Sequence, residues 1–285
     1  MVIIPIILLT LLILFYPMVS VFYYSVFDYN LMISGDIVFS GLNNFLRMFR
    51  DPMFYNALGV SLAWVVMNLV LQMTIGMLVA LLISKDFRGR GAIRTAILSP
   101  FAVSGVIAST LWLFMFQDSF GLINDILRKI GVISSPISWL SNPSLAIFAV
   151  VIAEVWRYTP FFIIIFSAAL QSVPQDLYEA AKIDGAGALK RFGSITLPLI
   201  KETIVITCIL RVVWEFNSVD VIYTLTNGGP INSTTTMAMY IVRTAINGSD
   251  MGYGSALTVA SFVLLAAFSL LLMRTTGVKL EEGLL

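Results

Sequence analysis

The chain has 285 residues, of which 59% are hydrophobic and only 12% are charged, and its net charge at pH 7 is +1. This balance excludes an ordinary water-soluble globular protein. The nearly equal numbers of acids and bases offer no basic surface for nucleic acid. Histidine is absent and Cys208 is the single cysteine, so we expect no metal site, no bound cofactor and no catalytic residues.

Six apolar segments follow one another along the chain, each long enough to cross a bilayer core about 30 Å thick as a helix. They cover residues of about 2–27, 57–83, 95–116, 145–170, 202–222 and 255–273. The runs are continuously apolar rather than alternating, so strands are not expected. The sequence therefore predicts an all-α membrane protein, a single domain over residues 1–285 with six transmembrane helices. The first segment lacks a basic leader, so we expect a retained span rather than a cleaved signal peptide.

The connections between these segments differ in positive charge, which is retained on the cytoplasmic side of membrane proteins. The connections after the second, fourth and sixth segments carry ten basic residues: Lys85, Arg88, Arg90, Arg94, Lys182, Lys190, Arg191, Lys201, Arg274 and Lys279. The alternate connections carry five: Arg47, Arg50, Arg128, Lys129 and Arg243. This asymmetry predicts that both termini are cytoplasmic.

Two of the outer connections have helical patterns of their own. Residues 233–247 read STTTMAMYIVRTAIN, which predicts a short interfacial helix opened by hydroxyl caps. Residues 121–130 predict another short helix. We expect both to lie outside the membrane core.

The inner connection, residues 171–198, reads QSVPQDLYEAAKIDGAGALKRFGSITLP and predicts two short helices around a glycine. Ser172 and Gln175 have the spacing of a capping box, and Pro174 suits a first helical turn. Gly185 can adopt the left-handed conformation that ends a helix. Pro198 marks the start of the fifth span.

The first of these helices is predicted to have an apolar side with solvated charges beside it. The apolar side consists of Leu177, Tyr178, Ala181 and Ile183, and the charges are Glu179, Lys182 and Asp184. Such a helix fits a groove on another protein. It equally fits an amphipathic helix that lies on the lipid surface.

The same connection resembles the EAA signature of the permeases of ATP-binding-cassette (ABC) importers. Glu179-Ala180-Ala181 is followed by Gly185 after three residues and by Ile195-x-Leu197-Pro198 after nine more, without a gap. In that family the segment is a coupling helix, between spans four and five, that docks on an ATPase subunit. The resemblance implies this coupling role for Tyr178, Glu179, Ala180, Ala181, Asp184 and Gly185.

The resemblance extends along nearly the whole chain and is strongest to the sugar-type branch, which includes the maltose, glycerol-phosphate and multiple-sugar permeases. It is carried by GLNNF at 41–45, DPMFYNAL at 51–58, LQSVPQDLYEAAKIDGA at 170–186, LTNGGPINSTT at 225–235 and GYGSALT at 252–258. Ala188 departs from the pattern, because an aromatic residue is expected there. The resemblance implies a prokaryotic cell membrane, a second homologous permease, an ATPase dimer that binds ATP and Mg²⁺, and an extracytoplasmic solute-binding protein as partners.

Four charged residues lie within a few turns of the middle of the fourth and fifth predicted spans: Glu154, Arg157, Arg211 and Glu215. An isolated charge at mid-membrane costs about 2.5–3.5 kcal/mol, so these residues are expected to face protein or water. Their spacing allows Glu154 to pair with Arg157, and Arg211 with Glu215, as buried ion pairs that orient the spans. Alternatively they line a wet cavity in which a substrate's hydroxyl groups are bound, together with Trp214, Asn217 and Asp220.

Two further patterns concern the packing of the spans. Asn68 and Gln72 form an i,i+4 polar pair that either lines the same path or makes a hydrogen bond to another helix. Ser104, Gly105, Ala108 and Ser109 form small-xxx-small pairs, which favour close helix contact.

An ion-coupled secondary transporter is the main alternative, because intramembrane carboxylates also suit ion coupling. It leaves the inner signature unexplained. The sequence holds no G-x-x-x-x-G-K-[ST] motif, so any ATP hydrolysis is expected on a separate partner, and we expect that this chain is not itself an enzyme.

Overall fold

The computed structural model describes residues 9–33, 35–84 and 88–277. Residues 2–8 of the first predicted span, and the basic residues Lys85 and Lys279, lie outside this range. The described residues form two compact units. One unit runs up to Leu62 and includes Thr235–Phe268, and the other contains Ala63–Thr234 and the residues from Ser269 onward.

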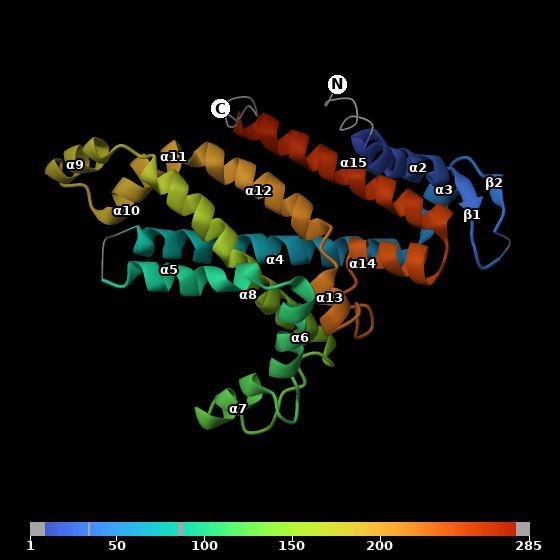
Figure 1. Ribbon diagram of the computed structural model, residues 1–285, viewed down its shortest axis with the longest axis horizontal. Coiled ribbons are helices and arrows are strands. Elements are labelled where there is room, and N and C mark those ends of the chain that lie inside the picture. Colours follow the sequence, from blue (N-terminus) through green and yellow to red (C-terminus); the bar gives the residue numbers. More distant parts are fainter. Residues whose placement is uncertain (1–8, 34, 85–87, 278–285) are drawn as a thin grey trace. The chain divides into compact units, whose positions relative to one another are not determined.

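Three helices of the described chain are long and apolar enough to cross a membrane: α4 (Pro52–Ile83), α8 (Pro143–Gln171) and α15 (Met251–Thr276). They confirm the predicted spans 57–83, 145–170 and 255–273. The start of α8 shows how the sequence sets a boundary, because the Asn142 side chain accepts a hydrogen bond from Ser144 N at 2.9 Å and Pro143 occupies the first turn. Figure 1 shows all three helices.

The first unit begins with a helix and a small hairpin. A π-helical segment (Leu11–Phe15) continues as α2 (Tyr16–Ser25), and β1 (Phe27–Tyr29) then pairs antiparallel with β2 (Ile37–Phe39). The expectation of no strands is therefore wrong here, and the first helix ends before residue 27. The Asn44 side chain supplies the physical reason, because its amide donates to Ser25 O at 3.1 Å and to Phe27 O at 2.8 Å. These carbonyls are thereby satisfied without continuing the helix.

The same unit contains α3 (Asn43–Arg50), α14 (Met237–Ile241) and a π-helical segment (Val242–Asn247) that leads toward α15. The Thr236 hydroxyl caps α14 by accepting from Met239 N at 3.4 Å, which confirms the hydroxyl-capped helix predicted within 233–247. The rings of Phe22 and Phe262 meet edge to face at 5.9 Å, so α2 packs on α15 (Figure 1).

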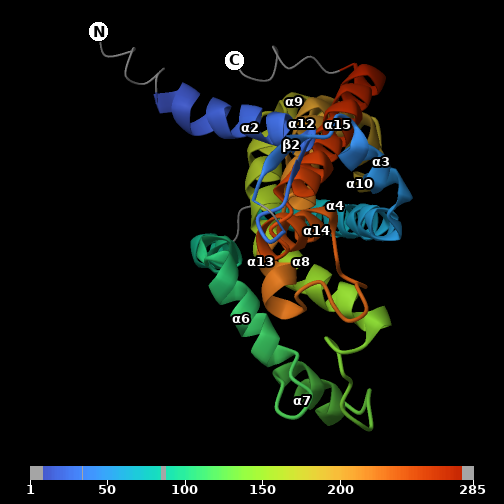
Figure 2. The same cartoon turned by 90° about the vertical axis from the view of Figure 1, so that its right-hand side faces the viewer.

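In the second unit, the segment predicted as one span over 95–116 is bent by 98°. It consists of α5 (Arg90–Leu98), a 3-10 turn (Ser99–Ala102) and α6 (Gly105–Met115). A continuous helix was therefore the wrong prediction. Pro100 cannot donate within a helix, and the Ser104 hydroxyl starts a new one by accepting from Ile107 N at 3.4 Å. Figure 2 shows α6 running away from the end of α5 toward α7 (Leu122–Lys129), which confirms the short helix predicted over 121–130.

The predicted fifth span, 202–222, is also interrupted. Helix α12 (Lys201–Phe216) ends before α13 (Asp220–Leu225), because the Asn217 amide turns back to donate to Val213 O at 2.8 Å and competes with the backbone. The remaining elements form the connection after α8: α9 (Gln175–Ile183), α10 (Ala188–Arg191), a π-helical segment (Phe192–Thr196) and α11 (Leu197–Leu199).

The core of the second unit lies where α4 meets α8. Phe162 and Phe166 are fully buried against Ala80. The close approach depends on Gly76, since a β-carbon there would stand 2.5 Å from the Phe162 β-carbon. Helix α6 packs on α13, and Gly105, Ala108 and Ser109 are its buried residues, which confirms the packing role predicted for these three. Ser104 is exposed and caps α6 instead.

Candidate coupling segment and buried charge cluster

The connection after α8 projects as two short helices around a glycine turn, as predicted (Figure 1). Gly185 has a φ of +74° and ends α9 in the left-handed conformation. Gly185 N donates to Lys182 O at 3.0 Å and Ala186 N to Ala181 O at 2.8 Å, which satisfies carbonyls of the last helical turn. A side chain at residue 185 would have space, because nothing lies within 4 Å of its β-carbon position. It would nevertheless strain the backbone, because residues other than glycine rarely adopt this positive φ.

The start of α9 differs from the predicted capping box. Pro174 is the N-cap residue, and no side chain caps the helix. The Ser172 hydroxyl donates backward to Ala169 O at 2.8 Å. The prediction of a capping box is therefore wrong, because Ser172 lies at the end of α8 and is too far from α9 to accept hydrogen bonds from the first amides of that helix.

The six predicted coupling residues occupy different faces of this segment. The Tyr178 hydroxyl lies 2.8 Å from the Thr196 hydroxyl, and its ring packs on the buried cluster of Ala169, Val173 and Ile200. Ala181 is half-buried, whereas Glu179, Ala180, Asp184 and Gly185 are exposed. Tyr178 thus ties α9 to the turn before α12, and Glu179, Ala180, Asp184 and Gly185 of the signature remain accessible.

The single apolar side predicted for α9 is wrong. Tyr178 and Ala181, three residues apart, are half-buried, whereas Leu177 on the same side is exposed, and the spacing of Ile183 places it on another side of the helix. Ile183 is 87% exposed, and Leu189 on α10 is 88% exposed. Two large apolar side chains that stand out so far from a charged connection are typical of a protein contact.

The buried charges gather around Arg211 of α12. Its guanidinium forms an ion pair with Glu215 one turn along α12, and its Nη2 lies 3.5 Å from Glu154 Oε1 on α8. The three side chains are at most 2% exposed. The pairing of Arg211 with Glu215 is confirmed, whereas the observed ion pair of Glu154 crosses to α12 instead of joining Arg157. The cluster therefore links α8 to α12.

Helix α4 contributes a third side to this cluster. Arg211 Nε donates to Gln72 Oε1 at 2.9 Å, and Gln72 Nε2 donates to Asn68 Oδ1 at 3.3 Å. One turn earlier, Trp64 Nε1 donates to Glu215 O at 3.1 Å. All three α4 side chains are fully buried. The hydrogen bond between helices is thus the correct alternative for the Asn68 and Gln72 pair.

Sequence reasoning missed Trp64, which reads as one more apolar residue of a long span. The only signal was its place four residues before Asn68 and eight before Gln72, on one face of the helix. The guanidinium of Arg211 also lies 3.8 Å from the centre of the Tyr158 ring, so an aromatic face covers the charge.

The other predicted path residues lie at or near the surface of the unit. Arg157 and Asp220 approach each other at α6, since a β-carbon on Gly105 would stand 2.8 Å from Arg157 Nη1 and 2.5 Å from Asp220 Oδ2. Trp214 is 50% exposed, and Asn217 and Asp220 are exposed. The predicted set therefore divides into a buried brace of Glu154, Arg211 and Glu215 and a peripheral group of Arg157, Trp214, Asn217 and Asp220.

The brace carries two carboxylates for one guanidinium. Glu154 Oε2 and both carboxylate oxygens of Glu215 lack a hydrogen-bond partner among the described residues, apart from the ion pairs. Charges buried in this way are costly unless they are paired, so the arrangement holds three helices in one register at an energetic cost.

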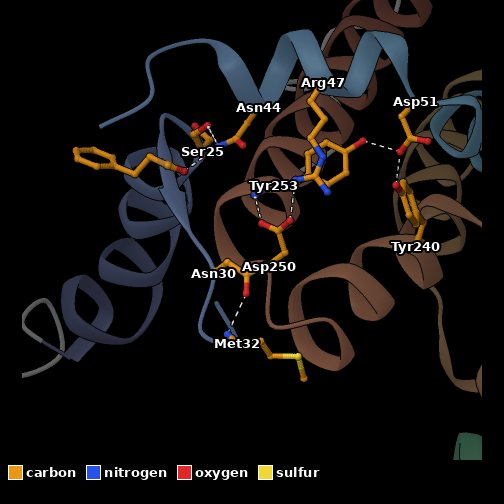
Figure 3. Close-up of polar contacts among 10 residues, drawn as sticks. Ser25, Asn30, Met32, Asn44, Arg47, Asp51, Tyr240, Asp250 and Tyr253 are labelled. Atoms are coloured by element: carbon orange, nitrogen blue, oxygen red, sulfur yellow. Dashed lines mark hydrogen bonds and ion pairs between the residues drawn. The ribbon is translucent and has the colours of Figure 1, made fainter. Parts of the chain in front are cut away.

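A second polar cluster lies in the first unit, where α3, α14 and α15 meet (Figure 3). The Asp51 carboxylate accepts hydrogen bonds from the hydroxyls of Tyr240 and, at 2.7 Å, Tyr253. Arg47 pairs with Asp250 at 2.8 Å and lies over the Tyr253 ring at 4.0 Å. Burial of the Asp51 carboxyl opposes ionisation, but the hydrogen bonds from the two tyrosines and from Met53 N, together with the charge of Arg47, hold the pKa of Asp51 below its ordinary value.

Membrane-length helices that follow one another along the chain, with a buried charge brace between them, define a multi-pass membrane protein. The chain belongs to the family of binding-protein-dependent transport system inner membrane components, whose model matches residues 32–276.

Characterised relatives extend over most of the chain. A trehalose/maltose transport system permease protein, MalF, of Thermococcus litoralis is 40% identical over 83% of this chain and 79% of that protein. A sulfoquinovosyl glycerol transport system permease protein, SmoG, of Agrobacterium fabrum is 34% identical over 96% of this chain and 89% of its own length. A trehalose transport system permease protein, SugA, of Mycobacterium tuberculosis is 32% identical over 94% of this chain and 85% of that protein.

A solved structure shares the fold. It is a bacterial alginate ABC transporter in complex with an alginate pentasaccharide-bound periplasmic protein, and the match has a TM-score of 0.84 at 24% identity over 98% of this chain and 95% of the matched chain.

Proposed function

We propose that this chain is one permease subunit of an ABC importer and forms, with a second homologous permease, the translocation path for a carbohydrate. The substrate would be a sugar, an oligosaccharide or a glycerol-phosphate-like polyol, delivered by an extracytoplasmic binding protein. The carbohydrate class is supported by the relatives, whose names specify trehalose, maltose and sulfoquinovosyl glycerol. Family membership favours this function over an ion-coupled secondary transporter.

The exposed connection that carries the EAA signature is the main observation behind the energy-coupling part of the proposal. Ile183 and Leu189 are almost fully exposed beside the solvated Glu179 and Asp184. A cytoplasmic ATPase dimer with bound ATP and Mg²⁺ would receive this surface, and its closure would move α9. Movement of α9 would pass through the Tyr178–Thr196 hydrogen bond to α12, which carries Arg211 and Glu215 of the brace.

The topology belongs to the proposal as well. We infer six spans with both termini in the cytoplasm of a prokaryotic cell, which places the connection 171–198 inside. Broken helices such as α5 with α6 and α12 with α13 are tolerated in a membrane where they are buried in protein or line a water-filled cavity. The interruption at Asn217 and Asp220 and the exposed Trp214 would then face the substrate path shared with the second permease.

Reconstitution of the whole transporter tests the proposal. The chain is co-expressed with its partner permease, ATPase and binding protein, and ATPase activity stimulated by the loaded binding protein is measured in proteoliposomes. Glu179→Ala and Gly185→Val should each lower stimulated hydrolysis at least several-fold while the chain still inserts. Glu202→Ala, an exposed carboxylate at the start of α12, is the matched control and should leave hydrolysis unchanged. Full stimulation in both test variants would contradict the coupling role.

A further inference from the structure

A large groove opens in the second unit between the end of α4, the end of α8 and the segment from α10 to α11. Its volume is about 1280 Å³. That is larger than the roughly 300–1,000 Å³ of most small-molecule pockets, and it suits an extended amphiphile. Figure 1 shows these elements ending together near α9.

The inner wall of the groove is apolar. Met73, Met77 and Leu81 of α4 face it along one side, and Phe166, Leu170 and Ile204 come from α8 and α12. Most of the other lining residues are apolar too. A sugar path needs closely spaced hydrogen-bonding groups, which this wall lacks, so the groove is better suited to hydrocarbon chains.

The mouth of the groove has a different chemistry. Among the lining residues, Lys182 of α9, Gln171 and Gln175 are exposed and Arg191 of α10 is half-buried, which places them on the solvent side, and the described lining contains no acidic side chain. Neither basic side chain has an ion-pair partner among the described residues. The groove therefore combines apolar depth at the ends of two long helices with a positively charged rim.

We propose that this groove binds an anionic phospholipid of the cytoplasmic leaflet. The acyl chains lie against α4 and α8, and the headgroup phosphate binds Lys182 and Arg191. This placement rests on the proposed topology, in which the connection 171–198 is cytoplasmic. Basic residues near the inner surface attract anionic lipids, and a rim of two such residues beside an apolar groove selects them over zwitterionic lipids.

The site has a consequence for coupling. Lys182 belongs to α9, which also carries the exposed Ile183, and Arg191 belongs to the segment that leads to Thr196 and α12. A lipid held by both residues fixes α9 against the membrane ends of α4 and α8. Lipid charge would thereby influence how firmly the coupling segment is held.

The test uses the complete transporter in nanodiscs that contain either phosphatidylglycerol or phosphatidylcholine, each with the same photoreactive acyl chain. Labelled peptides are mapped by mass spectrometry. Phosphatidylglycerol should label residues 73–82 and 166–170 more strongly than phosphatidylcholine. Lys182→Gln and Arg191→Gln should each lower that labelling about five-fold, and the double variant about 25-fold. Lys190→Gln is the matched control, because Lys190 neighbours Arg191 but does not line the groove.

Three results would overturn the proposal. Equal labelling by the two lipids, or undiminished labelling in the double variant, would remove the role of the headgroup. Labelling of residues 73–82 and 166–170 by neither lipid, in a complex shown to be assembled, would show that the groove does not hold lipid. Co-purification and sugar uptake are measured on the same samples, so failure of the lipid site is distinguishable from failure of the importer function.

Discussion

Arg211 on α12 donates from Nε to Oε1 of Gln72 on α4 across 2.9 Å, and both side chains are fully buried. This bond joins two long segments that are 139 residues apart in sequence. Removal of the acceptor while the donor stays buried costs about 1–3 kcal/mol. Gln72→Leu should therefore lower the thermal unfolding midpoint in detergent. Thr74→Val, an exposed substitution on the same helix, should leave the midpoint unchanged, and an equal effect of both would show that the bond contributes nothing.

Removing one carboxylate of the brace should have a smaller effect on stability than removing its guanidinium. Glu154 and Glu215 share Arg211, so Glu154→Gln or Glu215→Gln leaves a one-to-one ion pair, whereas Arg211→Met leaves two buried carboxylates without their central cation. Breaking a buried pair in this way costs about 3–5 kcal/mol. We expect good yields of assembled transporter from either glutamine variant and a severe loss from Arg211→Met, measured by gel filtration of the co-purified complex. The reverse order would contradict this view of the cluster.

Two glycines of α4 provide a controlled test of helix packing. A β-carbon at Gly76 would stand 2.5 Å from the Phe162 β-carbon, and nothing lies within 4 Å of the same position at Gly59. Gly76→Ala should destabilise the protein by about 1–3 kcal/mol through overpacking. Gly59→Ala should be neutral or slightly stabilising, because alanine favours helix. Unfolding midpoints of the two variants measure the difference, and a stable Gly76→Ala protein would show that α4 and α8 are not in close contact there.

Asp51 should make stability depend on acid pH. Its pKa is lower in the folded protein than the ordinary value of about 3.9, so its contribution is present above that pH and is lost as pH falls through the folded pKa. Burial and the hydrogen bond to Asp51 raise the pKa of Tyr240 to about 12, so the contribution of Tyr240 is lost as pH rises from about 10 toward that value. The thermal unfolding midpoint of the wild type should therefore fall both at acid pH and at alkaline pH.

Asp51→Asn isolates the acid limb, which is the fall of the unfolding midpoint at low pH. The stability difference between wild type and Asp51→Asn should be greatest above about pH 4 and should shrink below it. Asp125→Asn, at an exposed carboxylate of α7, should keep the wild-type acid limb. Identical acid limbs in wild type and Asp51→Asn would rule out the cluster in Figure 3 as the source.

Sequence patterns predicted the elements whose physics is local. Hydropathy over about 20 residues identified α4, α8 and α15, because transfer into lipid depends on composition. The Thr236 cap and the Gly185 turn were predictable because each depends on the chemistry of one residue. The membrane-length criterion does not tell where a span bends, so the break before Gly105 and the end of α12 at Phe216 were missed.

The candidate site was predictable in its membership but not in its pairing. An intramembrane charge must find a partner, which singled out Glu154, Arg157, Arg211 and Glu215, and the structure brings all of them except Arg157 into the brace. Which helix supplies the partner depends on tertiary packing, so the cross-helix pair of Glu154 with Arg211 and the hydrogen bond from Trp64 required the structure. On α9, the inward turn of Tyr178 depends on Thr196, 18 residues away, and no helical periodicity reports that contact.

Crosslinking from Ile183 tests the central claim most directly. In a Cys208→Ser background, Ile183→Cys is labelled with a photoreactive group, and the assembled transporter is illuminated in native membranes. We predict a crosslink to the ATPase subunit. In separate intact cells, the unlabelled Ile183→Cys thiol should be protected from a membrane-impermeant maleimide added outside the cell. Reaction of Ile183→Cys with the outside reagent, or crosslinks to lipid alone in the intact complex, would contradict it.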